Sequence, residues 1–338
     1  MVILMYVLLT GGKTMGHITP LLSIYSKLKN DYEIIYFGLK DSMEEEACKR
    51  LDIQFFPMNV LPFNRKNLLK NYHTYKCMKN EIKRIKSEFE NAPIKAIISS
   101  GGYVSFPLVF SFKNNKKVKK ILLEPNSVIG LANKVLSFKV DYICTQFDIS
   151  KNAKFITTGN PIKINNPIFD HPSFYKNSNM ILFVGGSNGA LEIVKLAYDF
   201  NCNFPDVEIF VITGNRYFET YKFNSSAHVY KRINDISSIF KFFKIIVSRS
   251  GASTITEIVM TKSASVLLPS KNVTANHQYK NAKYLENLNA CVMIIDYKKD
   301  SYLEVYNLFK NDDLILSIKG NIEKFNKINP LENVIKLI

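Results

Sequence analysis

The chain has 338 residues, of which 46% are hydrophobic and 22% charged, a composition typical of soluble globular proteins. Its length suffices for two domains with separate cores, and no apolar run reaches the roughly 18 residues that a membrane-spanning helix needs. The formal net charge of +16 indicates an anionic partner, such as nucleic acid, anionic lipid or a phosphate-bearing substrate.

The cysteines and the N-terminus bear on the cellular compartment. Five cysteines are scattered along the chain, and no pair of them has the spacing of metal ligands. We expect reduced structural thiols in a cytoplasm. The N-terminus lacks the basic region and the small-residue cleavage site of a secretory signal, so no such signal is expected.

Strand-like apolar runs alternate with helical patterns along the whole chain. The strands expected first are residues 2–9, 32–38, 53–58, 96–100, 119–124 and 142–145. After a break rich in Asn and Pro, near residues 158–178, the expected strands are 180–186, 207–213, 228–233, 245–249, 265–269 and 291–296. Several of these runs are apolar throughout, as parallel strands covered on both faces are.

This order predicts an α/β protein with two doubly wound, Rossmann-like domains, residues 1–160 and residues 161–338. The final helix is free to pack back on the first domain. Ligands of such domains bind outside the carboxyl ends of the strands, so we expect the site in the cleft between the two domains.

The first expected strand is followed by the glycine-rich segment GGKTMGH, residues 11–17. An ATP-binding P-loop is excluded, because that motif needs a glycine where this chain has Val7. A dinucleotide-binding fingerprint is excluded as well, since Lys13 stands where the middle glycine would let the backbone approach a pyrophosphate.

A more general function of this segment remains. A helix is expected to start near Ile18, with Pro20 in its first turn. Free backbone N–H groups at a helix start favour an anion. Histidine titrates near neutral pH, so His17 adds an acid/base group beside the expected anion site.

Three further glycine-rich turns follow expected strands, namely SSGGY at residues 99–103, GGSNGA at 185–190 and SRSGAST at 248–254. A single turn of this kind is most often only a tight turn. Four of them at strand-to-helix positions predict several anion-receptive helix starts around one cleft.

Seven motifs occur together in a recognisable order. They are Gly12–His17, Gly101–Ser105, Asn126 with Gly130–Lys134, Thr158–Pro161, Gly185–Ala190, Arg249–Glu257 and Asn276–Ala282. In order and approximate spacing the chain resembles MurG, the family of bacterial N-acetylglucosaminyltransferases of cell-wall synthesis, over roughly residues 5–290.

The resemblance implies a GT-B fold, in which two Rossmann-like domains face a central cleft. It also implies transfer of N-acetylglucosamine (GlcNAc) from UDP-GlcNAc to lipid I, which is undecaprenyl-pyrophosphoryl-MurNAc-pentapeptide. The acceptor is the C4 hydroxyl of the MurNAc sugar, the anomeric carbon is inverted, and the product is lipid II.

The resemblance assigns the UDP-GlcNAc donor to the C-terminal domain. Ser187, in the first turn of its helix, is expected to reach a donor phosphate, and Ile233 to contact uracil through its backbone. Glu257 is expected to accept hydrogen bonds from the ribose hydroxyls, a role that suits a carboxylate. The other donor-site residues that the resemblance implies are Lys163, Ala252, Ser253, Thr254, Ile255, Thr256, Gln278 and Asn281.

The same resemblance assigns the lipid-linked acceptor to the N-terminal domain. Asn126 is expected beside the reacting sugar. The residues expected to face the acceptor diphosphate are Gly12, Lys13, Thr14, Met15, Gly16, Gly101, Gly102 and Tyr103. Lys13 and Met15 stand where the family usually has glycine, and Lys163 stands where arginine is usual.

His17 is the first choice for the general base, because displacement needs a group that takes the proton from the attacking hydroxyl. An acceptor-orienting role is equally compatible with the resemblance. Taken alone, the residue would be read as a structural histidine that bonds the carbonyls of the turn. His73, His171 and His228 are expected at exposed or packing positions.

We expect neither a metal nor a cofactor. A diphosphate leaving group is often neutralised by a metal at Asp-x-Asp, and the nearest segment, Asp206-Val207-Glu208, lacks that pattern and begins a strand. Helix starts and backbone N–H groups are therefore expected to stabilise the developing charge on UDP.

A basic segment in the first half indicates contact with a membrane surface. Residues 65–86 contain eight Lys/Arg and one Glu, with apolar residues at helical spacing that include Leu68, Leu69, Tyr72 and Tyr75. Residues 112–120 add five lysines. We expect docking on anionic lipid at the cytoplasmic side of the cell membrane, although an ordinary surface helix explains the pattern as well.

Two other functions stay open. One is a UDP-sugar-dependent glycosyltransferase that acts on diacylglycerol or another lipid. The other is a non-catalytic relative that binds sugar nucleotides or polyanions. Nucleic acid is not an expected partner, because no nucleic-acid motif occurs. Other cell-wall synthesis proteins remain a possible class of partner.

Overall fold

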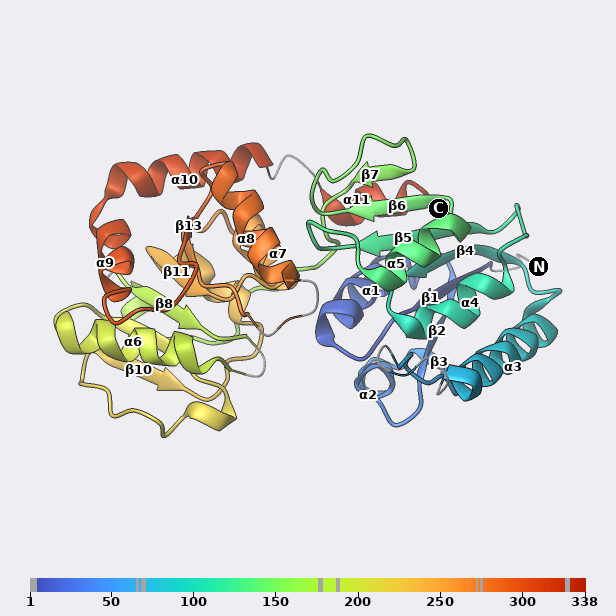
Figure 1. The fold of residues 1–338 in the computed structure, drawn as a ribbon, viewed down its shortest axis with the longest axis horizontal. Helices are drawn as coiled ribbons and strands as arrows, with labels where there is room; N and C mark the ends of the chain where they lie inside the picture. The colour runs from blue at the N-terminus through green and yellow to red at the C-terminus, as the bar shows by residue number, and fades with distance from the viewer. Residues whose placement is uncertain are drawn as a thin grey trace. The chain divides into compact units, whose positions relative to one another are not determined.

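The structure of this chain is a computed structural model that describes residues 5–64, 67, 71–175, 179–186, 189–271, 273, 276–325 and 329–338. Its contacts divide the chain into two compact units: unit 1 is Met1–Lys163 with Ile328–Ile338, and unit 2 is Ile164–Lys327. Each unit is built on one sheet whose recorded strand pairs are parallel, with helices packed on it (Figure 1). In the described part of the chain, no helix combines the length and the apolar character needed to cross a membrane.

The sheet of unit 1 has the strand order β3-β2-β1-β4-β5-β6-β7. Its strands are β1 Tyr6–Thr10, β2 Glu33–Leu39, β3 Gln54–Met58, β4 Ile94–Ser99, β5 Lys119–Glu124, β6 Tyr142–Thr145 and β7 Phe155–Thr157. The direction of winding reverses between β1 and β4, which is where doubly wound sheets bind their ligands. The glycine-rich turns after these two strands, at residues 11–14 and 100–102, therefore meet at this switch point.

Helices cover both faces of this sheet. They are α1 Met15–Leu28, α2 Met43–Arg50, α3 Asn71–Phe89, α4 Phe106–Ser111, α5 Leu131–Leu136 and α11 Pro330–Ile335. Buried residues of α3, α4 and α5 form one core with the sheet, and those of α1, α2 and α11 form the other. In α11, Val334 is fully buried, so the last helix of the chain belongs to the core of unit 1.

The sheet of unit 2 has the order β10-β9-β8-β11-β12-β13. Its strands are β8 Ile181–Val184, β9 Ile209–Ile212, β10 Ala227–Tyr230, β11 Ile245–Ser248, β12 Ser265–Leu267 and β13 Val292–Met293. Its helices are α6 Leu191–Asn203, α7 Ala252–Met260, α8 His277–Asn287, α9 Tyr302–Lys310 and α10 Asp312–Phe325. The central strands β8, β9 and β11 are buried over their whole length, which is why they are apolar throughout.

The α/β class and the order of elements are confirmed, and four details differ from expectation. Helix α1 begins at Met15, before the predicted start, so Pro20 lies inside the helix. The three-residue strand β7 was not predicted, because it carries too few residues to show a period. Lys120 is buried, and its ammonium group donates to the carbonyls of Asn115 and Val118, so it adds nothing to the basic surface.

The fourth difference concerns α3. Its buried face consists of Thr74, Met78, Glu81 and Ile85, whereas Tyr72 and Tyr75 are 77% and 61% exposed. The apolar stripe is therefore exposed at its first turns, where an ordinary surface helix would bury it against the core. Glu81 can be buried because the guanidinium of Arg84 pairs with it. Leu68 and Leu69 lie outside the described residues.

Candidate active site

A buried carboxylate stabilises the turn after β1. Glu44, at the start of α2, is fully buried and accepts hydrogen bonds from the backbone N–H groups of Lys13 (3.1 Å) and Leu39 (3.2 Å). A Cβ added to Gly12 would lie 2.1 Å from a Glu44 oxygen, so a larger residue there would displace the carboxylate that holds the turn. Lys13 has φ of 74°, a conformation that glycine adopts at far lower cost, and the bond to Glu44 helps to hold it.

The turn after β4 lies directly beside the first turn. The N–H of Ser100 donates to the carbonyl of Thr10 at 2.9 Å, which joins the two turns. Gly101 and Gly102 have φ of 88° and 75°. The ammonium group of Lys13 lies 5.8 Å from the ring centroid of Tyr103, within the range of a cation–π contact.

His17 is the third residue of α1, directly after the first turn, and its side chain contacts the second turn. Its Nδ1 lies 2.7 Å from the carbonyl oxygen of Ser100. A carbonyl can only accept, so Nδ1 carries the proton, and in the neutral ring Nε2 has the free lone pair. The cap residue Thr14 makes no side-chain hydrogen bond to the helix start, and of the first three helical N–H groups only that of His17 is recorded as donating, to the Thr14 carbonyl, so those of Met15 and Gly16 can meet an anion. This arrangement suits a base beside a phosphate.

The loop after β5 is organised by a second buried carboxylate, Glu124, which is 2% exposed. One of its oxygens accepts from the backbone and the side-chain amide of Asn126, each at 3.1 Å. The other accepts from the N–H of Gly130 and the side chain of Asn133, each at 2.9 Å. Glu124 thereby fixes the position of the predicted acceptor-side residue Asn126.

Replacing Glu124 by alanine is expected to destabilise the protein by about 3 kcal/mol or more, because it leaves several buried donors without their charged acceptor. Urea unfolding measures this cost. A second expected effect is a higher KM for the acceptor with an unchanged Kd for UDP, because only the loop of Asn126 is affected. Glu90→Ala, an exposed site in the same unit, is the matched control. An equal loss in both variants would contradict a special role of Glu124.

The corresponding turn of unit 2 follows β11 and leads into α7. Gly251 caps this helix without a side-chain hydrogen bond, so its first N–H groups are also available to an anion. Ala252, Ser253 and Thr254 are partly exposed. Ile255 is fully buried and faces the core, so it can line a nucleotide site only through its backbone.

The remaining members of the predicted donor set differ in exposure. Thr256 is 3% exposed, and its hydroxyl donates to the carbonyl of Ala252. Asn281 is fully buried and donates to the carbonyl of Ser250 at 3.3 Å. Gln278 is partly exposed, and its Oε1 accepts from the N–H of Ser270 at 2.8 Å. Asn281 therefore supports the turn after β11, whereas Gln278 reaches toward the surface.

Glu257 lies on α7 and has a perturbed carboxyl. Burial, and secondarily the charge of Asp235, raises its pKa from 4.5 to about 7. No hydrogen bond to its side chain balances this burial among the contacts recorded for the described residues. A half-buried carboxylate without a fixed partner is suited to accept from ligand hydroxyl groups.

Three further residues belong to the predicted donor set. Helix α6 begins at Leu191, so Ser187 is not in its first turn, and Ser187 itself lies outside the described residues. Ile233 is 8% exposed, so little of this residue is open to a ligand in the free protein. Lys163 is exposed and is the last residue of the first segment of unit 1.

Sequence patterns did not reveal Glu44 and Glu124 as site residues. Glu44 begins a run of three glutamates, and such a run at a helix start is usually read as a solvated cap. Glu124 stands at the end of an apolar strand, and only the fold shows that the loop at residues 126–133 turns back onto it.

Comparison with known proteins agrees with this architecture. Residues 6–145 match the glycosyltransferase family 28 N-terminal domain, and residues 180–317 match the glycosyltransferase family 28 C-terminal domain. Among solved structures, MurG of Acinetobacter baumannii has a TM-score of 0.77 at 20% identity, with 99% of each chain covered. The glycotransferase of kitacinnamycin has a TM-score of 0.75 at 12% identity, covering 99% of this chain and 98% of that one. The fold is therefore GT-B.

Curated relatives are closer in sequence. A protein of Lactobacillus helveticus is 32% identical over 318 residues, which cover 86% of each chain. One of Natranaerobius thermophilus is 31% identical, covering 86% of this chain and 87% of its own. Both are named UDP-N-acetylglucosamine--N-acetylmuramyl-(pentapeptide) pyrophosphoryl-undecaprenol N-acetylglucosamine transferase. With this identity over most of its length, the chain belongs to the MurG family of N-acetylglucosaminyltransferases.

Proposed function

We infer that this protein transfers GlcNAc from UDP-GlcNAc to the C4 hydroxyl of MurNAc in lipid I and so forms lipid II. The names of its curated relatives support this substrate pair. The observation that carries the mechanism is the 2.7 Å contact between His17 Nδ1 and the carbonyl of Ser100, because it leaves Nε2 as the basic atom.

In the proposed reaction, Nε2 of His17 takes the proton of the C4 hydroxyl as that oxygen bonds to the anomeric carbon. The bond from this carbon to the UDP oxygen breaks at the same time, on the opposite face, which inverts the configuration. The start of α1 and the turn at residues 100–102 bind the acceptor diphosphate through backbone N–H groups. Asn126, held by Glu124, orients the reacting sugar.

We further propose the donor roles in unit 2. The start of α7, with Ser253 and Thr254, stabilises the negative charge that develops on the departing UDP. Glu257 accepts from the ribose hydroxyls, and Gln278 bonds the hydroxyls of GlcNAc. Ile233 offers its backbone to uracil. For Ser187 and Lys163, contact with the donor phosphates remains a prediction.

The test follows labelled sugar from UDP-GlcNAc into purified lipid I in detergent, with diacylglycerol as a parallel acceptor. Labelled lipid II, absent when lipid I is omitted, is the expected result. Transfer to diacylglycerol alone would reject the acceptor assignment. Tight UDP-GlcNAc binding without transfer to either lipid would reject the enzymatic role.

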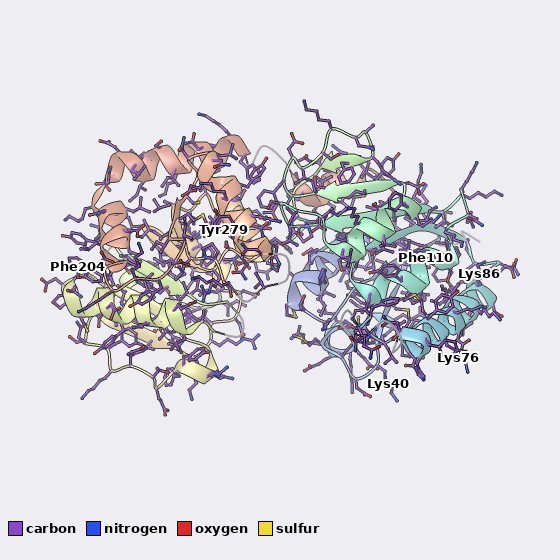
Figure 2. All side chains as sticks on the ribbon, in the orientation of Figure 1. Lys40, Lys76, Lys86, Phe110, Phe204 and Tyr279 are labelled. Atoms are coloured by element: carbon purple, nitrogen blue, oxygen red, sulfur yellow. The ribbon has the colours of Figure 1, made fainter. Side chains whose placement is uncertain are left out.

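We also propose that unit 1 docks on an anionic membrane at the cytoplasmic side. Tyr72 and Tyr75 project from the first turns of α3, and exposed lysines follow along the helix, with Lys76 and Lys86 near its two ends (Figure 2). Exposed aromatic rings beside lysines match the polarity of a lipid headgroup layer. A second apolar surface lies over α5 and the turn after it, where Leu131 and Phe138 are 63% and 75% exposed.

Neutralising the lysines of α3 is expected to release the protein from anionic vesicles. Each basic residue near such a surface contributes about 1 kcal/mol, so four glutamine substitutions should weaken binding roughly 1,000-fold at low salt. Co-sedimentation with phosphatidylglycerol vesicles measures this. The substituted residues are Lys76, Lys79, Lys83 and Lys86. The charge-matched control in unit 2 replaces Lys222, Lys299, Lys310 and Lys324. Equal release by both sets would show that only net charge matters.

A further inference from the structure

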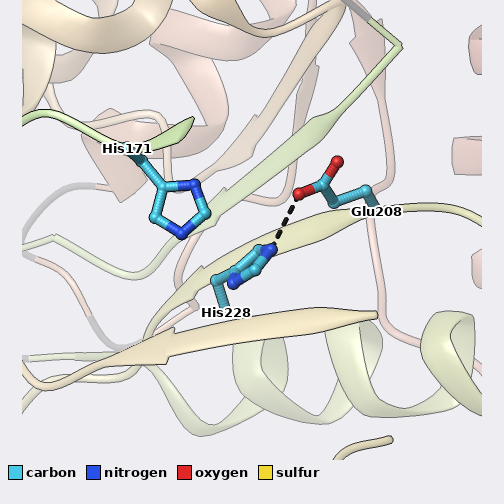
Figure 3. A group of neighbouring side chains, drawn as sticks. All are labelled: His171, Glu208 and His228. Carbon is cyan, nitrogen blue, oxygen red and sulfur yellow. Dashed lines mark hydrogen bonds and ion pairs between the residues drawn. The ribbon is translucent and has the colours of Figure 1, made fainter. Parts of the chain in front are cut away.

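Two histidines and a glutamate that sequence patterns left unconnected come together in unit 2. His171 precedes a short 3₁₀ turn at Pro172–Tyr175, Glu208 directly precedes β9, and His228 lies in the edge strand β10. Each offers one ligand atom, and these atoms lie within 4.8 Å of one another (Figure 3). All three residues are half-buried, so the cluster is shielded yet reachable by an ion.

We propose that His171, Glu208 and His228 form a zinc-binding site, which fastens the segment before β8 to the edge of the unit 2 sheet. Two imidazoles and one carboxylate are a ligand set that Zn²⁺ accepts, with water in the fourth position. No part of the expected glycosyl transfer uses these residues, so the proposal is independent of the proposed function.

The charge balance of the cluster favours a cation. Glu208 is half-buried, and among the ion pairs of the described residues its only recorded partner is His228, whose Nε2 lies 2.7 Å from Oε1. The chain has 45 Lys and Arg residues, yet none is recorded as pairing with this carboxylate. Histidine is a weak counter-charge near neutral pH, because it is charged only when protonated. A divalent ion would supply the missing positive charge.

Zinc coordination requires only small movements of the three side chains. Metal–ligand distances of about 2.0–2.1 Å in a tetrahedral site separate neighbouring ligand atoms by roughly 3.3 Å. The 2.7 Å contact between His228 and Glu208 must therefore open slightly, and any wider separation, none of which exceeds 4.8 Å, must close to about 3.3 Å. Rotation of half-buried side chains suffices for both changes.

The surrounding residues hold the ligands in place. The ring of His171 packs edge-on against Phe210 with centroids 5.0 Å apart, and the hydroxyl of Ser173 donates to Glu208 Oε1. The N–H of Ser173 donates to His171 Nδ1 at 3.2 Å. This last hydrogen bond is long, and a metal on either nitrogen of the His171 ring would break it. Its loss is the main local cost of metal binding.

The experiment titrates Zn²⁺ into the metal-stripped full-length protein and follows the heat of binding. One ion per chain is expected, together with a rise in the midpoint of thermal unfolding, because zinc binds the folded state. His171→Gln, Glu208→Gln and His228→Gln should each weaken binding by at least about 10–100-fold, the loss that even an outer-shell partner causes. No saturable binding, or binding of equal strength in these variants, would overturn the proposal.

The matched control removes another described pair of possible ligands, His73 and Cys77, whose Nδ1 and Sγ lie 3.4 Å apart on α3. The His73→Gln/Cys77→Ser variant should bind zinc as the wild type does, and loss of binding in it would refute the assignment. X-ray absorption at the zinc edge of the wild-type protein identifies the atoms that coordinate the ion, without any substitution. Two imidazoles and oxygen around the ion are expected, whereas a sulfur ligand would exclude the site.

Discussion

The His17→Ala variant is expected to lose about 10²–10⁴-fold in kcat for lipid II formation, which is the usual contribution of a general base. In free energy this corresponds to roughly 3–5 kcal/mol of transition-state stabilisation. The reason is the tautomer fixed by the carbonyl of Ser100, which leaves Nε2 as the proton acceptor. Rates of labelled GlcNAc transfer in detergent measure the effect. UDP affinity should not change, since His17 belongs to unit 1, whereas the predicted nucleotide residues other than Lys163 belong to unit 2.

A second substitution separates the base from a residue that only orients the acceptor. In His17→Gln, the amide N–H₂ can still donate to the carbonyl of Ser100, but no basic atom remains. The base role predicts that this variant is nearly as inactive as His17→Ala. If His17→Gln retains most of the activity, His17 is a positioning residue. His73→Gln, on the exposed side of α3, controls for the loss of one histidine.

The affinity for UDP is expected to rise with pH through about 7, because Glu257 must be ionised to accept from the ribose hydroxyls. Its pKa in the free protein is about 7, so at lower pH the carboxyl is protonated and binding must release that proton. The Kd for UDP should therefore increase about tenfold for each pH unit below 7. Calorimetric titrations from pH 5.5 to pH 8.5 measure this dependence.

Glu257→Gln tests the same residue through binding and through stability. The variant should lose roughly 100-fold in UDP affinity at pH 8, about the strength of two hydrogen bonds to a charged group, and its Kd should no longer depend on pH. Glu323→Gln, which removes an exposed carboxylate of the same unit, should leave the UDP affinity unchanged. A pH-dependent Kd that persists in Glu257→Gln would contradict the assignment.

A rise in pH lowers the stability contributed by Glu257, whereas it raises the affinity for UDP. The pKa of Glu257 is raised in the folded state, so the folded protein holds a proton that the unfolded chain has already released. The contribution of Glu257 to the free energy of unfolding is therefore present below pH 4.5 and is lost as the pH rises to about 7. A rise from 4.5 to about 7 corresponds to roughly 3 kcal/mol. Glu257→Gln should thus be more stable than the wild type at pH 8, which urea unfolding can show.

Much of the fold followed from local patterns. The apolar runs predicted at residues 180–186 and 207–213 contain β8 and β9, because a strand buried on both faces must be apolar throughout. The glycine-rich turns were equally visible, since a positive φ at Gly101 and Gly102 is accessible mainly to glycine. The ordered motifs also identified the family, because their number and order are far more specific than any one of them.

Other features depended on which side of an element faces the core. In α3 the sequence placed Tyr72 and Tyr75 among the apolar residues at helical spacing, whereas the structure buries Met78 and Ile85 and exposes both tyrosines. Lys120 was counted as a surface charge. It is a buried residue of β5, and its ammonium group donates to the backbone carbonyl of Val118. Packing against neighbouring elements determines both the buried side of α3 and the burial of Lys120. The local periodicity of the sequence does not show such packing.

The sequence by itself determined the α/β class, the order of elements, the glycine-rich turns and the family. Only the tertiary structure decided the proton position on His17, the carboxylates beneath the turns and the meeting of His171 with Glu208 and His228. The physical reason is distance along the chain. His17 is 83 residues from Ser100, and Glu44 is 31 residues from Lys13. Such contacts arise only when the sheet brings the ends of its strands together, whereas helix and strand periods are set by neighbouring residues.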